Sequence, residues 1–183
     1  FDSSFPKIIT IARLDKRKSH QNILMTIKNL IPTYPNIKYV CIGSGVEKSN
    51  LEKLKIQLGL EKQVIFLPRI EEKLKAALLN EANLFLMPSI IYKKSVEGFG
   101  ISYIEAAQYG VPSIGGIDGG ASDAIKHENT GLICDGNILD EIYSSISLLL
   151  ENNKYLEYGK AAKENSAKFR WDMIIEEYKK ILV

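Results

Sequence analysis

Short apolar runs alternate along this chain with segments whose apolar residues recur at helical spacing. The runs are KIITIAR (7–13), IKYVCIG (37–43), QVIFLP (63–68), ANLFLMP (82–88), VPSIGG (111–116) and GLICDG (131–136). Between the first two, Ile23, Leu24 and Ile27 share one helical face. Strands this uniformly apolar are typical of a parallel sheet covered on both faces. The sequence therefore predicts an α/β fold, a doubly wound parallel sheet, with helical patterns alone after about Glu151.

Composition sets limits on the class of protein. The chain has 183 residues, of which 45% are hydrophobic, enough for the core of one domain spanning residues 1–183. The net charge is only +2, with acidic and basic residues interspersed, which argues against a nucleic-acid partner. No stretch approaches the ~18 apolar residues of a membrane span, and no leader pattern opens the chain. We expect a soluble, cytoplasmic protein.

Charged residues follow the first apolar run, in the segment RLDKRKSH (13–20). Ligands of open α/β sheets lie at the carboxyl ends of the strands, in the loops that lead into helices. Arg13 offers a planar guanidinium for phosphate oxygens, and Lys18 a mobile ammonium group. The two could hold a diphosphate from two sides. The alternative is ordinary surface charge.

The segment EGFGI (97–101) joins a glycine-flanked aromatic residue to an expected helix start. Gly98 and Gly100, on either side of Phe99, would let the backbone approach a ligand near Ile101 and direct free N–H groups at it. Such a turn suits an anion or the oxygens of a sugar. Tight strand-to-helix turns also need glycine for steric reasons alone, so this feature by itself leaves both interpretations open.

Two glutamates flank this turn at different positions. Glu105 would lie about one turn inside the helix, where its carboxylate can accept hydrogen bonds from two neighbouring hydroxyls, as in a ribose. Glu97 precedes the helix and would meet another part of the same ligand, such as the hydroxyls of a sugar. The alternative is that Glu97 is a solvated loop charge and that the helix dipole favours Glu105.

Several smaller features favour structural roles. Gly43 opens Gly43-Ser44-Gly45, which is similar to the start of a dinucleotide-binding turn, but Lys48 stands where a third glycine belongs, so a plain tight turn is the favoured interpretation. His20 and His127 lack a partnered nucleophile and are interpreted as surface or capping residues. The two cysteines lack metal-ligand spacing and are interpreted as reduced core thiols.

The ordered motifs RLDKRKSH, IGSG, VIFLPRI, EGFGISYIEAAQYGVPSIGG and TGLICDG closely resemble the C-terminal, nucleotide-sugar-binding half of retaining GT-B glycosyltransferases of family four. The likeness covers nearly the whole chain and implies a Rossmann-like half of the GT-B fold. It also implies that Arg13 and Lys18 bind the donor diphosphate and that Glu105 holds the ribose. By the same resemblance, the donor sugar faces Glu97 and the backbone amides around Phe99, Gly100 and Ile101.

The resemblance has further implications. Arg69 and Ile70, after the third strand, would line the base, and no metal is needed. Catalysis would consist of stabilising the leaving group, with Glu97, Arg13 and Lys18 as the residues that carry it. The segment IIYKKSV (90–96) departs from the family because it is longer than in many members. The motifs SVEGFG, IEAA and VPSIGGIDGG, however, look like those of mannosyl-transferring members, so GDP-mannose is favoured weakly over a UDP-sugar.

The family's other half, which binds the acceptor, has no counterpart here. Because the chain starts at Phe1 rather than Met, we interpret it as part of a longer polypeptide that binds donor but transfers no sugar alone. Peripheral membrane association would come only through the missing half. Two alternatives remain. A hydrolase could use paired carboxylates, although nothing indicates the water or nucleophile it needs, and a non-catalytic nucleotide-binding module would show no sugar preference.

Overall fold

The computed structural model describes residues 3–181, which contain a six-stranded parallel sheet. Its strands are β1 (Lys7–Ile11), β2 (Lys38–Ile42), β3 (Val64–Leu67), β4 (Leu84–Met87), β5 (Ser113–Gly116) and β6 (Gly131–Cys134). Each lies within one of the six apolar runs, so the predicted parallel sheet is confirmed. The spatial order is β3-β2-β1-β4-β5-β6, which is the order of a doubly wound Rossmann-like fold.

The strand order reverses at β1. Ile9 lies opposite Val40 of β2 on one side and opposite Phe85 of β4 on the other. The loops that leave β1 and β4 therefore run in opposite directions over the sheet, and a crevice opens between the carboxyl ends of these two strands. In open α/β sheets, ligands bind in such a crevice.

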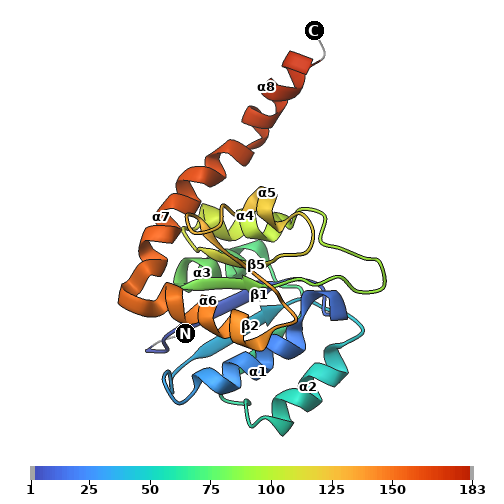
Figure 1. Ribbon diagram of the computed structural model, residues 1–183, viewed down its shortest axis with the longest axis vertical. Coiled ribbons are helices and arrows are strands. Elements are labelled where there is room, and N and C mark those ends of the chain that lie inside the picture. Colours follow the sequence, from blue (N-terminus) through green and yellow to red (C-terminus); the bar gives the residue numbers. More distant parts are fainter. Residues whose placement is uncertain (1–2, 182–183) are drawn as a thin grey trace.

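Helices cover both faces of the sheet (Figure 1). On one face, a buried cluster joins the strands to α1 (His20–Leu30), α2 (Lys48–Gln57) and α6 (Leu139–Leu150). On the other face, a second cluster joins them to α3 (Glu72–Glu81), α4 (Ile101–Gln108) and α5 (Ala121–Ala124). Both faces of the central strands are thus buried, which explains why these strands have almost continuous apolar sequences, whereas Ile65 on the edge strand β3 is exposed.

The C-terminal segment is helical, as predicted. Helix α7 (Lys154–Ser166) packs against α4 and α6, and α8 (Trp171–Ile181) projects away from the sheet (Figure 1). Short 3-10 turns complete the structure: η1 (Lys16–Lys18), η2 (Glu151–Asn153) and η3 (Ala167–Phe169). Within the described part of the chain, no helix is both long enough and apolar enough to cross a bilayer.

Candidate functional site

The loop after β1 is held in place by the loop after β2. The backbone N–H groups of Ala12 and Leu14 donate to the carbonyl oxygens of Ile42 and Ser44, at 3.0 and 2.9 Å. The loops approach so closely that a Cβ on Gly43 would lie 1.9 Å from the Ala12 carbonyl oxygen. This contact accounts for glycine at position 43 without a ligand, in agreement with the favoured tight-turn interpretation.

His20 also contacts the loop after β1, on the side that faces the core. Its ring is buried, with Nε2 3.0 Å from the carbonyl oxygen of Arg13 and Nδ1 3.8 Å from the Cys41 Sγ atom. Burial lowers the pKa of His20, and the bond to the Arg13 carbonyl only partly opposes this effect. The interpretation of His20 as a surface or capping residue is therefore wrong. His127, by contrast, is exposed, and its Nδ1 accepts a hydrogen bond from the Ile133 N–H.

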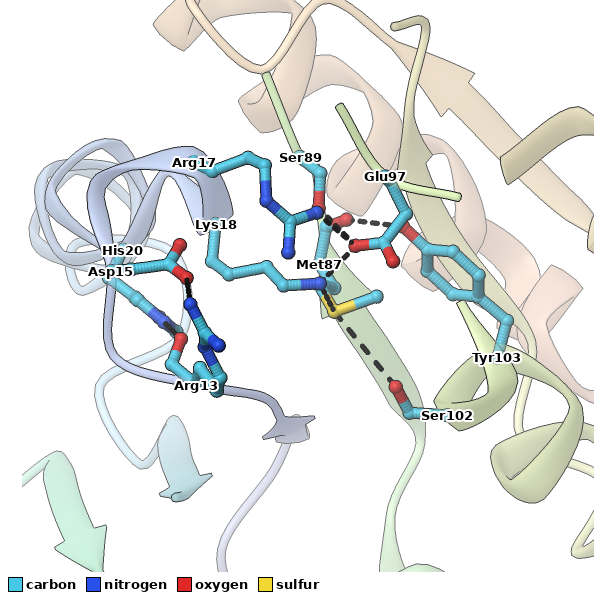
Figure 2. Close-up of polar contacts among 10 residues, drawn as sticks. All are labelled: Arg13, Asp15, Arg17, Lys18, His20, Met87, Ser89, Glu97, Ser102 and Tyr103. Atoms are coloured by element: carbon cyan, nitrogen blue, oxygen red, sulfur yellow. Dashed lines mark hydrogen bonds and ion pairs between the residues drawn. The ribbon is translucent and has the colours of Figure 1, made fainter. Parts of the chain in front are cut away.

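Lys18 and Glu97 meet in a buried group of polar side chains, which we call the Glu97 cluster: Arg17, Lys18, Ser89 and Glu97 (Figure 2). The Lys18 ammonium group bonds Glu97 Oε2 and lies 3.2 Å from the Met87 sulfur. Arg17 and Ser89 donate to the same carboxylate oxygen, at 2.9 and 3.2 Å. The cluster joins the loop after β1 to the loop after β4, across the crevice.

The electrostatics of the cluster keep Glu97 ionised. Burial opposes ionisation, but the hydrogen bond and charge of Lys18 and the charge of Arg17 outweigh it, so the pKa of Glu97 lies below its ordinary value. All the contacts of this carboxylate among the described residues fall on Oε2. Oε1 is left as an acceptor on a carboxylate whose orientation is already fixed.

The turn after Glu97 leads into α4, which begins at Ile101 as predicted. Gly100 has a φ of 81°, and a Cβ there would lie 2.4 Å from the Tyr103 ring, so the fold requires this glycine. A Cβ on Gly98 would meet nothing within 4 Å. The turn is tied down by the Gly120 N–H, which donates to the Glu97 carbonyl oxygen at 2.8 Å. The fold therefore explains the second glycine but leaves the first without a structural reason.

Glu105 lies one turn inside α4, as predicted, but apart from the Glu97 cluster. Its Oε1 accepts a hydrogen bond from Lys75 of α3, at 3.0 Å. Burial tends to lower the pKa of Lys75, but its bonds to Glu72 and Glu105 raise it overall. Glu105 lines a largely apolar cavity of about 670 Å³ with Phe99, Ile101 and residues of η3 and α8.

Three other predicted site residues share a hollow of about 250 Å³ at the ends of β1 to β3: Arg13, Gly43 and Arg69. The Arg13 side chain is 80% exposed and lies 3.4 Å from the Asp15 carboxylate, so its guanidinium is accessible to a ligand. Ile70 packs against the core beside α3 and α4. The hollow, the Glu97 cluster and the Glu105 cavity thus contain most of the predicted residues, whereas Gly98, Gly100 and Ile70 line none of the three.

Sequence reasoning missed the contributions of Arg17, Ser89 and Lys75. Arg17 stands beside Lys18 in a run of basic residues, and Ser89 follows the fourth apolar run, so position at a strand end was the available signal for both. Lys75 lies within a helix and carried no such signal. Among the described residues, no group of three or more His, Cys, Asp or Glu side chains could hold a metal ion.

The sequence family described as "Glycosyl transferases group 1" matches residues 1–169. A GDP-mannose-dependent alpha-(1-6)-phosphatidylinositol monomannoside mannosyltransferase of Mycobacterium tuberculosis is 29% identical over 92% of this chain and 45% of its own length. A GDP-mannose-dependent monoacylated alpha-(1-6)-phosphatidylinositol monomannoside mannosyltransferase of Corynebacterium glutamicum is 30% identical over the whole of this chain and 48% of its own length.

The fold has counterparts among solved structures. The pneumococcal O-GlcNAc transferase GtfA, crystallised with UDP and GlcNAc, superposes with a TM-score of 0.83 at 21% identity, over 97% of this chain and 35% of the other. At this identity, the similarity concerns the fold. The chain spans less than half the length of the relatives and of the structure named here.

Proposed function

Because this chain belongs to the group 1 glycosyltransferases, we propose that it is the donor-binding half of a retaining enzyme that uses a nucleotide-diphosphate sugar. One observation carries the proposal. Glu97 lies at the crevice with Oε2 held by three donors and Oε1 left as an acceptor. An ionised, oriented carboxylate at the carboxyl end of a doubly wound sheet suits the hydroxyl groups of a sugar.

We propose the following role for each of the predicted residues. Glu97 would accept a hydroxyl of the donor sugar through Oε1, beside the backbone of Gly98 to Ile101. Arg13, exposed above the end of β1, would bind the diphosphate together with Lys18. Glu105 would hold the ribose and Arg69 would lie along the base. Lys18 and Lys75 already pair with the two glutamates, so donor binding must share or rearrange these contacts.

The reaction would rest on stabilising the departing diphosphate. The charge that develops on its oxygens would be met by the Arg13 guanidinium and, once its contact with Glu97 is shared or rearranged, by the Lys18 ammonium. Glu97 would fix the sugar on the opposite side of the bond that breaks. Two cationic side chains can supply this charge, and we propose that donor binding needs no divalent metal.

GDP-mannose is the favoured donor and a UDP-sugar the alternative. The names of the mycobacterial and corynebacterial relatives specify GDP-mannose, and their matches extend over 92% and 100% of this chain. Because these relatives are about twice as long as the chain, we propose that an N-terminal half binds the body of the acceptor, a glycan or lipid. The chain alone would bind donor without transferring sugar.

Isothermal calorimetry tests the proposal. The chain is titrated with GDP, GDP-mannose, UDP and a UDP-sugar, with and without EDTA. We expect GDP-mannose to bind more tightly than GDP because only the former reaches Glu97, and we expect EDTA to have no effect. Equal affinity for each nucleotide and its sugar derivative would instead support a nucleotide-binding module without sugar recognition.

Matched variants locate the two glutamates on the ligand. Glu105→Ala should weaken GDP and GDP-mannose alike, by about 1 to 3 kcal/mol if the bonds to two hydroxyls are lost. Glu97→Ala should weaken GDP-mannose alone. If Glu97→Ala reduces the affinity for GDP as much as that for GDP-mannose, the assignment of Glu97 to the sugar is wrong.

A further inference from the structure

A strained hairpin lies in the loop between β4 and α4. Tyr92 and Ser95 exchange two backbone hydrogen bonds, at 3.1 and 2.9 Å, around the two-residue turn of Lys93 and Lys94. Both lysines have positive φ angles, of 47° and 65°. Turns of this kind strongly prefer asparagine and glycine, and side chains held in this region of backbone space tend to mark functional sites. The backbone conformation of the turn does not favour lysine at either position. We therefore look for a role of these lysine side chains other than shaping the turn.

The hairpin is fixed against the loop that follows β1. The Ile90 N–H donates to the Arg17 carbonyl oxygen at 2.8 Å. The ammonium groups of Lys16 and Lys93 lie 5.7 and 5.6 Å from the centre of the Tyr92 ring. No carboxylate within the described part of the chain forms an ion pair with either lysine. Two cations are thus held at one aromatic ring without a counter-charge.

These groups line a cavity of about 390 Å³, which we call the basic cavity. Its charged lining consists of Arg13, Lys16, Arg17 and Lys93 with Asp15 and Glu47. Arg13 lies beside Asp15, and Arg17 is paired with Glu97, so these two cations are partly neutralised. Lys16 and Lys93 form no ion pair with the described residues, and although Glu47 also lines the cavity, its four cations outnumber its two carboxylates. Such a cavity attracts an anion with several oxygens, because each ammonium group can donate several hydrogen bonds.

We propose that the basic cavity is an anion subsite for a phosphate group carried by the acceptor. The cavity shares Arg13 with the proposed donor-binding residues and Arg17 with the Glu97 cluster, but its lining includes neither the turn of residues 98–101 nor Glu105. A phosphate there would lie beside the donor rather than in its place. This inference rests on the proposed function and names its acceptor class: a phosphate-bearing molecule, either a phospholipid headgroup or a free phosphorylated polyol.

The test compares two lysines of one turn. Lys93→Met and Lys16→Met each remove a cation from the basic cavity. Lys94→Met is the control, because Lys94 shares the left-handed backbone of the turn but is not among the residues that line the cavity. Circular dichroism melts establish that all variants are folded. Calorimetry with GDP then measures donor binding in each.

Two phosphate probes follow, both at saturating GDP. Free glycerol 3-phosphate is titrated by NMR, and co-sedimentation measures binding to phosphatidylcholine vesicles with and without about 30% phosphatidylinositol. We expect Lys93→Met and Lys16→Met to weaken binding of the preferred probe about tenfold, as for one lost charge-assisted hydrogen bond, and Lys94→Met to change it less than twofold. Preference for the vesicles or for glycerol 3-phosphate identifies the source of the phosphate.

The outcomes separate this inference from the proposed function. If the wild-type chain binds GDP but neither phosphate probe, or if Lys94→Met weakens phosphate binding as much as Lys93→Met, the subsite does not exist. If Lys93→Met and Lys16→Met weaken GDP binding equally, the basic cavity belongs to the donor and the inference is wrong. Failure to bind either GDP or UDP, with phosphate binding intact in the absence of nucleotide, would overturn the proposed donor role and leave the anion subsite standing.

Discussion

The Glu97 cluster predicts unequal effects when either partner of its buried ion pair is removed. In Lys18→Met, the Glu97 carboxylate keeps its hydrogen bonds from Arg17 and Ser89, at 2.9 and 3.2 Å. In Glu97→Leu, the hydrogen-bond partner that remains to the Lys18 ammonium among the described residues is the Met87 sulfur, at 3.2 Å. Lys18 is 6% exposed, so water cannot replace the lost carboxylate without local rearrangement.

The sizes of these effects follow from the contacts. Glu97→Leu leaves a buried, unpaired charge and should lower the free energy of unfolding by about 3 to 5 kcal/mol. Lys18→Met removes one hydrogen bond to a charged group, a loss of about 1.5 to 3 kcal/mol. The double variant replaces the pair with apolar side chains of similar size, an exchange that is often nearly neutral. It should therefore be more stable than Glu97→Leu alone.

Urea unfolding followed by circular dichroism measures all three variants. Glu176→Leu on α8 is the control, because the ion pair between Glu176 and Lys179 is exposed and should contribute little. Equal losses in Lys18→Met and Glu97→Leu would refute the asymmetry derived from the three donors. If adding Lys18→Met destabilised Glu97→Leu further, Lys18 would not be the group left unpaired.

Three further predictions concern binding and pH. Gly98→Ala should have the melting temperature of the wild type but bind GDP-mannose more weakly in calorimetry, whereas Gly100→Ala should have a lower melting temperature. Equal decreases in melting temperature for both variants would contradict the difference in free space around the two glycines. Arg13→Ala should weaken GDP binding by about 1.5 to 3 kcal/mol and leave guanosine binding unchanged, and equal losses would indicate a structural effect. The pKa of Glu97 in the folded protein lies below its ordinary value of 4.5. The ionised carboxylate therefore stabilises the fold above that pH, and this contribution is lost as the pH falls through the folded pKa. Between about pH 5 and pH 3, the urea midpoint should accordingly fall less in Lys18→Met than in the wild type.

The fold could be predicted from the sequence because each helix and strand has a pattern that can be recognised within a few residues. The apolar runs around β1 and β4 are long enough to identify buried strands, and the glycines before Ile101 mark the start of α4. The rule that ligands lie at the carboxyl ends of parallel strands then selected Lys18 and Glu97. The structure brings these two side chains together although 79 positions separate them.

The partners of the site could not be read from local patterns. Arg17 contacts Glu97 across 80 positions, and Lys75 contacts Glu105 across 30, so these pairs depend on how loops from different strands fold over one edge of the sheet. Hydrophobic periodicity does not encode such contacts. His20 shows the same limit, because a polar residue at a helix start resembles a surface residue until the neighbouring strand that covers it is known.

The contact between His20 and Cys41 makes the alkylation rate of the Cys41 thiol a measure of local opening beneath the loop that carries Arg13. The Cys41 thiol is fully buried, and burial raises its pKa to about 12, so an alkylating reagent can attack it only while the surrounding structure is open. Cys134 has a similarly raised pKa, of about 12, but it lies on β6, two strands beyond β4. Faster alkylation of Cys41 than of Cys134 would indicate local opening around β2 and the loop after β1, and donor binding that stabilises this loop should slow the reaction of Cys41 more than that of Cys134.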